Sequence, residues 1–412
     1  MSKLEELIQK LCPNGVEYKT MDELGYFYGG LSGKSRDDFV DGNAKFITYK
    51  NIYSNLALNL AVDDKVKIEE DENQNTIQYG DVLFTGSSET PDECGFSSVL
   101  TTQTEEKLYL NSFCFGYRFF DNSLFLPDFT KYLFRSQKLR VAIGKTASGV
   151  TRFNVSKKKM GKIRIPIPPI EVQEEIVRIL DKFTELTAEL TAELTARKKQ
   201  YEFYRDKLIL EQENVEYKTL GEIATITRGG NFQKKDFTTN GIPCIHYGQI
   251  YTKYDLYANK TFTFIPQSVA DKSKKAVYND IVMAVTSENI EDVCKCVAWL
   301  GEEDIAVSGH TAIIHHNQNA KYLSYFFHTQ MFFEQKKKYA HGTKVIEVTP
   351  NKLENIVIPI PSLEEQSRIV KILDNFHSLV TDISEGLPAE IEARQKQYEY
   401  YRDKLLTFKE LA

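Results

Sequence analysis

Two short segments of the chain imitate the motifs of phosphate-binding and nuclease sites. Residues 29–35 (GGLSGKS) resemble a phosphate-binding loop, but three residues separate the glycines where that loop needs four, so the motif fails. Asp92, which follows a proline, and the Glu105-Glu106-Lys107 run resemble an arrangement in which two carboxylates hold Mg²⁺ and a lysine steadies the attacking water. The spacing is loose, and the second half of the chain has no counterpart. A stand-alone Mg²⁺-dependent nuclease that uses Asp92, Glu105 and Lys107 is therefore kept only as an alternative.

Cysteine and histidine residues show no spacing typical of a metal site. The six cysteines are scattered without a CxxC pair, which is the pattern of reduced structural thiols. The seven histidines form neither an HExxH motif nor a paired ligand spacing. The sequence also lacks the Asn/Asp-Pro-Pro-aromatic motif with which amino-methyltransferases hold a flipped base, and it lacks a glycine-rich cofactor loop. None of these patterns thus indicates a catalytic residue, a metal site or a cofactor site.

Charged residues are distributed unevenly along the 412 residues. The 52 Lys and Arg against 58 Asp and Glu give a net charge of −6, which by itself argues against a general nucleic-acid binder. Residues 131–164, however, contain eleven basic residues and no acidic one, and residues 321–352 carry a net charge of +4. One basic cluster in each half of the chain favours binding to a polyanion such as DNA. A solvated charged face is the alternative interpretation of each cluster.

The chain contains an internal tandem repeat, which decides its architecture. The segment VEYKTMDELGYFYGG near the N-terminus corresponds to VEYKTLGEIATITRGG about two hundred residues later. IPIPPIEVQEEIVRILDKF (165–183) corresponds to IPIPSLEEQSRIVKILDNF (358–376), and ARKKQYEFYRDKLI (196–209) corresponds to ARQKQYEYYRDKLL (393–406). Most residues between these anchors differ. Two halves with the same framework and different central parts are therefore expected.

Each half is predicted to be a mixed α/β domain followed by a long helix. Short β-rich runs bounded by Gly, Asn and Asp indicate the domain, and an Ile-Pro-x-Pro segment indicates where the helix begins. Apolar residues at three- and four-residue steps form one stripe along each helix, so the two helices are expected to cover each other. The predicted fold class is mixed α/β: two similar α/β domains joined by two long antiparallel coiled-coil spacer helices, related by a pseudo-two-fold tandem repeat. The expected boundaries are residues 1–169 and 213–362 for the two domains, and 170–212 and 363–412 for the two spacer helices.

The first spacer contains a four-residue repeat, TELTAELTAELTAR, with Leu186, Leu190 and Leu194 in register. Each TAEL unit adds about one helical turn, or ~6 Å of length. The second spacer is longer by one such unit and contains Gly386-Leu-Pro388, where a break or kink is expected. Two basic domains on a spacer of set length predict a protein that binds two DNA half-sites at a fixed separation.

The tandem layout, the two Ile-Pro-Ile-Pro segments that lead to Glu-x-Gln, the KQYEFYRDKL and KQYEYYRDKL helix ends and the TAEL units together resemble the specificity subunit of Type I restriction–modification systems. The resemblance covers essentially the whole chain. It implies a non-catalytic subunit whose two target-recognition domains each read one half of a split, asymmetric double-stranded DNA sequence, in a system of phage defence. It also implies two adenine-N6 methyltransferase subunits, which carry S-adenosylmethionine, and translocating restriction subunits, which carry ATP and Mg²⁺.

Spacer and partner contacts follow by position from the spacer pattern and the resemblance, whereas DNA contacts follow from side-chain chemistry and the repeat alignment. Lysine and arginine are expected to contact mostly phosphates, and the serines and His246 are expected to contact base edges. The expected spacer and partner contacts are Gln173, Leu186, Leu190, Leu194, Arg197, Tyr201, Gln366, Arg394 and Tyr398. The expected DNA contacts are Lys34, Arg36, Lys50, Ser87, Ser88, Lys145 and Arg152 in the first domain, and Lys234, Lys235, His246, Ser287, Lys336 and Lys344 in the second.

Two further expectations concern the location of the protein and a third class of function. No run approaches the ~18 apolar residues of a membrane span, and the N-terminal residues are not those of a signal peptide, so a cytoplasmic protein is expected. Besides the nuclease, the other alternative is a coiled-coil protein that tethers DNA without sequence preference. Equal affinity for scrambled duplexes would favour that alternative.

Overall fold

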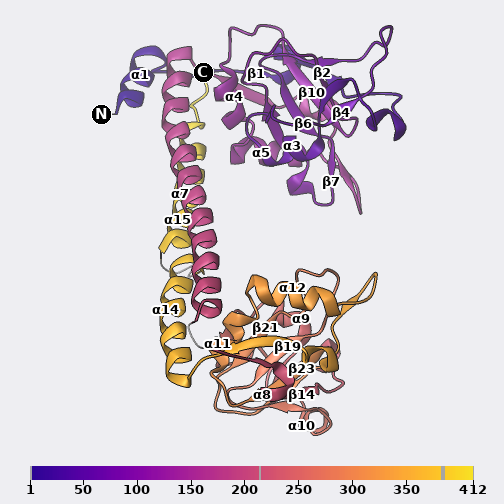
Figure 1. The fold of residues 1–412 in the computed structure, drawn as a ribbon. Helices are drawn as coiled ribbons and strands as arrows, with labels where there is room; N and C mark the ends of the chain where they lie inside the picture. Colours follow the sequence, from indigo (N-terminus) through magenta and orange to yellow (C-terminus); the bar gives the residue numbers. More distant parts are fainter. Residues whose placement is uncertain (1, 213–214, 382–385, 412) are drawn as a thin grey trace. The chain divides into compact units, whose positions relative to one another are not determined.

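The computed structural model describes residues 2–212, 215–381 and 386–411. The chain divides into two compact units. Unit 1 comprises residues 1–189 and 391–412, and unit 2 comprises residues 190–390. Figure 1 shows that each unit joins an α/β domain to parts of long helices. Within the described ranges, no helix has the length and apolar character needed to cross a membrane.

The strands of unit 1 form two sheets and two ribbons. One sheet contains, in spatial order, β2 (Gly25–Gly29), β10 (Cys114–Phe119), β6 (Val82–Thr85) and β8 (Ser97–Val99), all antiparallel. The other contains β4 (Lys65–Val66), β3 (Ala44–Ile47), β9 (Leu108–Leu110) and β5 (Thr76–Ile77), with β3 and β9 parallel. The ribbons pair β1 (Glu17–Thr20) with β12 (Arg164–Ile167) and β7 (Ser87–Ser88) with β11 (Phe153–Asn154). The short helices are α1 (Lys3–Leu11), α2 (Met21–Leu24), η1 (Asp37–Phe39), α3 (Tyr49–Ser54), η2 (Pro91–Glu93), α4 (Pro127–Leu133), α5 (Gln137–Gly144) and α6 (Lys157–Met160).

Unit 2 repeats this arrangement with one added strand. Its first sheet contains β14 (Ala224–Arg228), β23 (Thr311–His316), β19 (Ile281–Ala284), β21 (Cys296–Trp299) and β16 (Tyr257–Ala258). The second contains β17 (Thr263–Ile265), β15 (Ile242–Ile245), β22 (Ile305–Val307) and β18 (Lys275–Ala276), with β15 and β22 parallel. The ribbons pair β13 (Glu216–Thr219) with β25 (Val357–Ile360) and β20 (Thr286–Ser287) with β24 (Ile346–Glu347). The short helices are α8 (Leu220–Ile223), η3 (Lys234–Asp236), α9 (Tyr247–Ile250), α10 (Gln267–Ala270), α11 (Ala320–Phe326), α12 (Gln330–Tyr339) and α13 (Pro350–Leu353).

Three longer helices follow the two domains. α7 (Ile170–Leu210) is one uninterrupted helix of 41 residues, of which the first part belongs to unit 1 and the rest to unit 2. α14 (Leu363–Thr381) belongs to unit 2. α15 (Gly386–Leu405) enters unit 1 from Ile391 onward. The second spacer thus contains two separate helices, and Gly386, at the site of the expected break or kink, has a φ of +76°. Residues 382–385, which separate α14 from α15 in the sequence, lie outside the described residues.

The repeated sequence motifs form the same local structures in both units. The VEYKT segments form β1 and β13, which pair with the Ile-Pro segments β12 and β25 in equivalent antiparallel registers. Thr20 and Thr219 then start the next helix with a capping box, in which Glu23 and Glu222 accept from the threonine N–H. Because these bonds are local, the repeated residues determine them without help from the differing central parts.

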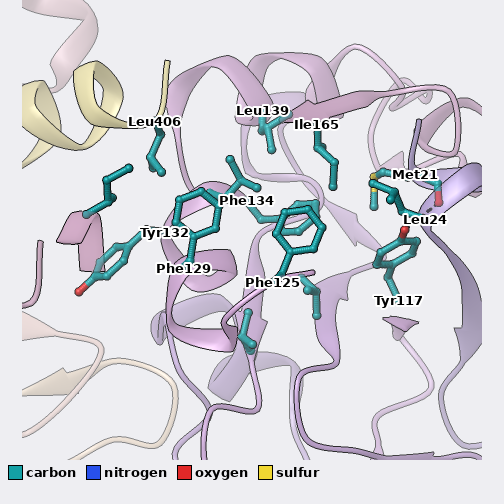
Figure 2. Packing of buried hydrophobic residues seen from close by; sticks show 14 of the residues in the cluster. Met21, Leu24, Tyr117, Phe125, Phe129, Tyr132, Phe134, Leu139, Ile165 and Leu406 are labelled. Atoms are coloured by element: carbon teal, nitrogen blue, oxygen red, sulfur yellow. Dashed lines mark hydrogen bonds between the residues drawn. The ribbon is translucent and has the colours of Figure 1, made fainter. Parts of the chain in front are cut away.

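The core of unit 1 takes in both ends of the chain. Tyr117, Phe129 and Ile165 are fully buried in one cluster, to which Leu406, just beyond α15, also belongs (Figure 2). The phenol of Tyr117 donates to the carbonyl oxygen of Met21 at 2.7 Å. Burial of one leucine side chain contributes roughly 2 kcal/mol to folding, so the C-terminal segment stabilises the first domain.

A glutamine anchors the start of each spacer helix to its own domain. Gln173 is fully buried, accepts from the N–H of Leu126 at 2.9 Å and donates to the carbonyl oxygen of Pro168 at 2.8 Å. Gln366 is also fully buried and makes the equivalent bonds to Asn319 at 3.0 Å and to Pro361 at 2.9 Å. We expected both glutamines to serve spacer or partner contacts. Their polar atoms bond to residues of their own unit, which agrees with the spacer role, and a partner contact by either glutamine stays a prediction.

Aromatic side chains join the end of one spacer to the start of the other within each unit. In unit 1 the ring of Phe183 on α7 stacks on Tyr401 of α15, with centroids 5.4 Å apart. In unit 2 the ring of Tyr204 on α7 stacks on Phe376 of α14, with centroids 6.0 Å apart. Each domain is therefore bound to the beginning of the helix that follows it and to the end of the other spacer.

The remaining expected spacer residues differ in exposure. Tyr398 is 7% exposed in the core of unit 1, and its ring lies 6.3 Å from that of Tyr132. Tyr201 packs on the core of unit 2, with its ring 5.7 Å from His377. Tyr398 and Tyr201 are thus internal packing residues. The three leucines of the TAEL repeat, Leu186, Leu190 and Leu194, are half-buried. Arg197 is exposed and forms an ion pair with Glu193 at 3.3 Å. Arg394 donates to Gln397 at 3.2 Å.

Candidate nucleic-acid interface

An open cleft of about 580 Å³ lies in unit 1, where β7, β11, α3 and η2 come together. It includes three residues that the sequence predicted as DNA contacts, Ser87, Ser88 and Arg152. Tyrosine and phenylalanine rings provide much of the remaining wall, together with two carboxylates. The lining residues are Tyr49, Tyr53, Ser87, Ser88, Glu89, Glu93, Phe113, Thr151 and Arg152.

Hydrogen bonds hold one carboxylate of the cleft in place. Glu93 accepts from the phenol of Tyr53 and from the hydroxyl of Ser88, both at 3.0 Å. These bonds stabilise the charged form and lower the pKa of Glu93, the bond from Tyr53 most. Tyr49 donates to the backbone oxygen of Ser87 at 2.9 Å. The cleft is therefore an ordered surface that presents a fixed negative charge at neutral pH.

Two arginines of the first basic cluster bind backbone oxygens of segments that line or flank this cleft. Arg135 donates to the backbone oxygens of Tyr53 at 2.9 Å and Ser97 at 2.7 Å. Arg140 donates to the backbone oxygens of Asp92 at 2.8 Å and Cys94 at 2.7 Å. Burial lowers the pKa of both guanidinium groups to about 10, so both remain charged at neutral pH. Part of the charge that favoured polyanion binding in the sequence is therefore structural.

Unit 2 has the same backbone framework around different side chains. Ser287 pairs with Ile346 as Ser88 pairs with Phe153, so β20 and β24 correspond to β7 and β11. His310 takes the place of Phe113, because the backbone oxygen of each accepts from the N–H of the residue before the matching strand, Gly86 before β7 and Val285 before β20. The residue before β24 is Val345, where unit 1 has Arg152.

The polar groups near this second framework are also different. Thr286 and His310 are hydrogen-bonded through Oγ1 and Nδ1 at 3.2 Å. Arg228 donates to the carboxylate of Glu347 at 3.0 Å. The phenol of Tyr251 donates to the backbone oxygen of Thr286 at 2.7 Å, which matches the bond that Tyr49 makes in unit 1. A shared framework thus presents two different sets of donors, acceptors and apolar groups.

The expected DNA contacts of this framework and of the surface around it range from buried to exposed. Ser87 is buried and accepts from Arg152, Ser88 is half-buried, and Ser287 is half-buried in β20. Lys50 lies on α3 beside Tyr49, a residue of the cleft in unit 1. The exposed members of the set are Arg36, Lys50, Lys145 and Arg152 in unit 1, and Lys234, Lys235 and Lys344 in unit 2.

Three expected DNA contacts are corrected by the structure. The side chain of Lys34 is only 8% exposed and forms an ion pair with Glu72. Lys336 is buried, and its ammonium donates to the backbone oxygens of Glu291 at 2.9 Å and Val293 at 2.6 Å. These lysines satisfy internal acceptors and are not free to bind a phosphate.

His246 is the third of these corrections. Its side chain is 6% exposed, and Nδ1 accepts from the N–H of Gly248 at 3.2 Å, which caps α9. Burial lowers the pKa of His246 to about 4, so the ring is neutral at pH 7. The histidine stabilises a helix start and does not present an edge to a base.

The residues of the nuclease alternative lie in two separate segments. Asp92 lies in η2, whereas Glu105 and Lys107 lie just before β9. In the part of the chain that the structure describes, no three His, Cys, Asp or Glu side chains come together in a way that could hold a metal ion. The geometry gives the nuclease alternative no support.

Six residues of the cleft were not predicted from the sequence: Tyr49, Tyr53, Glu89, Glu93, Phe113 and Thr151. One signal could have found the tyrosines, because Tyr-x-x-x-Tyr occurs at residues 49–53 and again at residues 247–251. No comparable signal marks Glu93 or Phe113. They reach the cleft only because η2 and the segment before β10 fold against α3 and β7.

Comparison with known proteins identifies the family. The family model described as "Type I restriction modification DNA specificity domain" matches residues 13–197 and 212–393. A specificity subunit of the type I restriction enzyme EcoR124I/EcoR124II from Escherichia coli is 40% identical over 269 residues, which are 62% of this chain and 65% of that protein. A putative type I restriction enzyme specificity subunit from Haemophilus influenzae is 35% identical over 272 residues, which are 63% of this chain and 68% of that protein. The matched region of this chain thus spans about two thirds of each relative.

A solved structure from work on the assembly and conformational transition of the type I R-M system has a TM-score of 0.65 to this chain. The two are 17% identical, and the match covers 96% of this chain and 98% of that chain. This likeness concerns the fold, and with the two matches of the family model it confirms the expected fold class. Because that model matches both halves and most of the length, the chain belongs to the family of Type I restriction–modification DNA specificity domains.

Proposed function

We propose that the chain is the sequence-reading subunit of a Type I restriction–modification complex and binds a bipartite, asymmetric double-stranded DNA site. In this proposal, the domain of residues 1–169 binds one half-site and the domain of residues 213–362 binds the other. The spacer segments 170–212 and 363–412 set the unspecified gap between them. The chain itself performs no catalysis.

One observation carries this proposal: the two units place different side chains on the same framework. Arg152, Phe113 and Glu93 belong to the cleft of unit 1. Val345 and His310 take the places of Arg152 and Phe113 in unit 2. Base edges in the major groove differ in their donors, acceptors and methyl groups, so surfaces with different groups select different bases. A protein that only tethers DNA would need basic charge and no such difference.

The exposed basic residues supply the sequence-independent part of binding. Lys50 and Lys145 in unit 1 and Lys234, Lys235 and Lys344 in unit 2 are exposed and are proposed to contact phosphates. Such contacts give affinity and salt dependence without selecting a sequence. They explain how a chain with a net charge of −6 binds DNA locally.

We further propose the partners that the family membership supports. Two adenine-N6 methyltransferase subunits would bring S-adenosylmethionine, and restriction subunits would bring ATP and Mg²⁺, all in the cytoplasm. Exposed positions on the spacers, such as Arg197, are the proposed partner contacts. The relatives named above are specificity subunits of such enzymes, which supports this assignment.

Selection from a randomised DNA library tests the proposed function. The purified full-length chain is incubated with random duplexes, and the bound fraction is sequenced. The expected result is one motif with two specified blocks separated by a gap of constant length. Enrichment of no motif at all, with equal affinity for scrambled duplexes, would favour the non-specific tether instead.

A further inference from the structure

Arg152 is held at one end of its guanidinium group and open at the other. Its Nε donates to Oγ of Ser87 at 3.0 Å, and its guanidinium lies over the ring of Phe113, 5.5 Å from the centroid. The residue is exposed. Among the described residues, no ion pair and no further hydrogen bond engages its two terminal nitrogens. The side chain is therefore oriented by the protein, while both terminal NH₂ groups are left for a ligand.

The geometry of such an arginine suits one base in particular. Two parallel N–H donors match the O6 and N7 acceptors of guanine in the major groove, and this bidentate pair is the commonest specific arginine–base contact. Orientation of the guanidinium by Ser87 and Phe113 before binding reduces the entropy that is lost on forming the pair. The same arrangement would also suit a phosphate, so the surroundings must decide between the two.

The surroundings of Arg152 disfavour a phosphate. Glu89 and Glu93 line the same cleft, and the bonds from Tyr53 and Ser88 keep Glu93 ionised at neutral pH. A phosphate in the cleft would meet this negative charge. The major-groove edge of a G·C pair instead offers acceptors on guanine and an amino donor on cytosine, which complement a guanidinium and a carboxylate.

We infer that Arg152 is a specificity-determining residue that recognises a guanine in the first half-site. This inference rests on the proposed function of the chain as a DNA reader. It assigns a base to a residue that was expected, like the other basic residues, to contact a phosphate. The second half-site is read without an equivalent arginine, because Val345 stands at this position and is 57% exposed.

The test applies the library selection to full-length variants. Arg152→Val removes the donors, whereas Arg152→Lys keeps the charge but loses the two-pronged geometry. Both variants are expected to lose the preference for guanine at one position of the first block and to keep every other position, including the whole second block. Affinity for the wild-type motif is expected to fall about 5- to 100-fold, which corresponds to the ~1–3 kcal/mol of one bidentate contact.

Lys145→Val is the control, because Lys145 is an exposed basic residue outside the lining of the cleft. It is expected to weaken binding to all sequences alike and to reduce the salt dependence by about one ion. If Arg152→Lys leaves the selected motif unchanged, or if Arg152→Val behaves like Lys145→Val, the inference is wrong. If the wild-type chain selects no motif, the proposed function itself fails, which is a different result. Retention of the second block shows that a variant is folded and bound.

Discussion

The carboxylate of Asp403 accepts a hydrogen bond of 2.8 Å from the backbone N–H of Gln137, which lies 266 positions earlier in the chain. Asp206 makes the same bond to Gln330 at 2.9 Å. Both aspartates belong to the repeated Tyr-Arg-Asp-Lys-Leu motif, and both accept from the first residue of a helix, α5 or α12. Each copy of the motif thus fixes the end of a spacer helix to the first residue of a helix in a domain.

Removal of the Asp403 carboxylate should destabilise unit 1. The preceding residue of α5, Ser136, makes no capping bond through its side chain, so Asp403→Ala leaves the N–H of Gln137 without its partner. Loss of a helix cap costs about 1 kcal/mol, with a range of about 0.5–2 kcal/mol. Urea unfolding should show this decrease for Asp403→Ala and a smaller one for Asp403→Asn, which keeps an acceptor. Asp403→Ala with the same free energy of unfolding as the exposed control Glu399→Ala would contradict the role of this joint.

Replacement of Gln173 by leucine should lower the free energy of unfolding more than replacement of a surface glutamine on the same helix does. Gln173→Leu leaves the buried N–H of Leu126 and the carbonyl oxygen of Pro168 without this partner. Each buried unsatisfied group costs about 1–3 kcal/mol, so a loss of about 2–5 kcal/mol is expected. Gln200 is an exposed residue of α7, so Gln200→Leu is the matched control. This substitution should change the free energy of unfolding by less than about 0.5 kcal/mol. Equal effects of the two substitutions in thermal or urea unfolding would show that the buried amide does not anchor the spacer.

The sequence predicted the shared role of the two anchoring glutamines but not their hydrogen-bond partners. Gln173 and Gln366 stand at the same place in two nearly identical motifs, so their shared role followed from the repeat. Their hydrogen-bond partners in the domains did not, because Leu126 and Asn319 lie in segments that differ between the halves.

The basic residues show why composition alone predicts a site poorly. Lys336 and Lys344 belong to one charged cluster, yet Lys336 is buried against backbone oxygens of residues 291 and 293, and Lys344 is exposed. Arg135 belongs to the basic cluster of residues 131–164 but satisfies backbone oxygens of a distant segment. The difference depends on tertiary packing of residues far apart in the sequence. For the same reason the sequence did not predict Glu93 and Phe113, which line the cleft from two separate segments of the chain.

Acid should destabilise unit 2 in particular, because the three histidines whose pKa is lowered by burial, His246, His316 and His328, lie in its residues. His316 is 9% exposed, and burial lowers its pKa to about 4, against about 6.5 in the unfolded chain. Between pH 6.5 and 4 the unfolded state therefore binds a proton that the folded state does not, so stability falls as the pH falls through this window. The contribution of His316 is at most about 3 kcal/mol.

A single substitution should isolate this effect. His316→Asn keeps an acceptor for the N–H of Gln318, which Nδ1 of His316 accepts at 3.1 Å, and does not titrate. Urea unfolding at pH 7, 6 and 5 should show a shallower loss of stability for His316→Asn than for the wild type. His341→Asn replaces an exposed histidine and serves as the control. An unchanged pH dependence in His316→Asn would rule out this residue as the acid-sensitive group.

Deletion of residues 191–194, one TAEL unit, should change the gap of the DNA motif and nothing else. These residues lie within the uninterrupted helix α7, so their loss shortens the helix by about 6 Å, close to two base-pair rises. The cleft of unit 1 and the β20–β24 framework of unit 2 lie outside the deleted segment, so both specified blocks should be retained. Library selection with the deleted chain measures both quantities. A changed block, or an unchanged gap, would contradict the role of α7 as a spacer of set length.

Sequencing of DNA methylation in cells with and without this chain tests the central claim most directly. The account predicts N6-methyladenine at a split motif with two specified blocks and a constant gap in cells that express the chain and its partner subunits. It predicts loss of that methylation when only this chain is deleted, and a relaxed guanine position when Arg152→Val replaces the wild type. A methylation pattern that is the same with and without the chain would contradict the claim that the chain selects the DNA sequence.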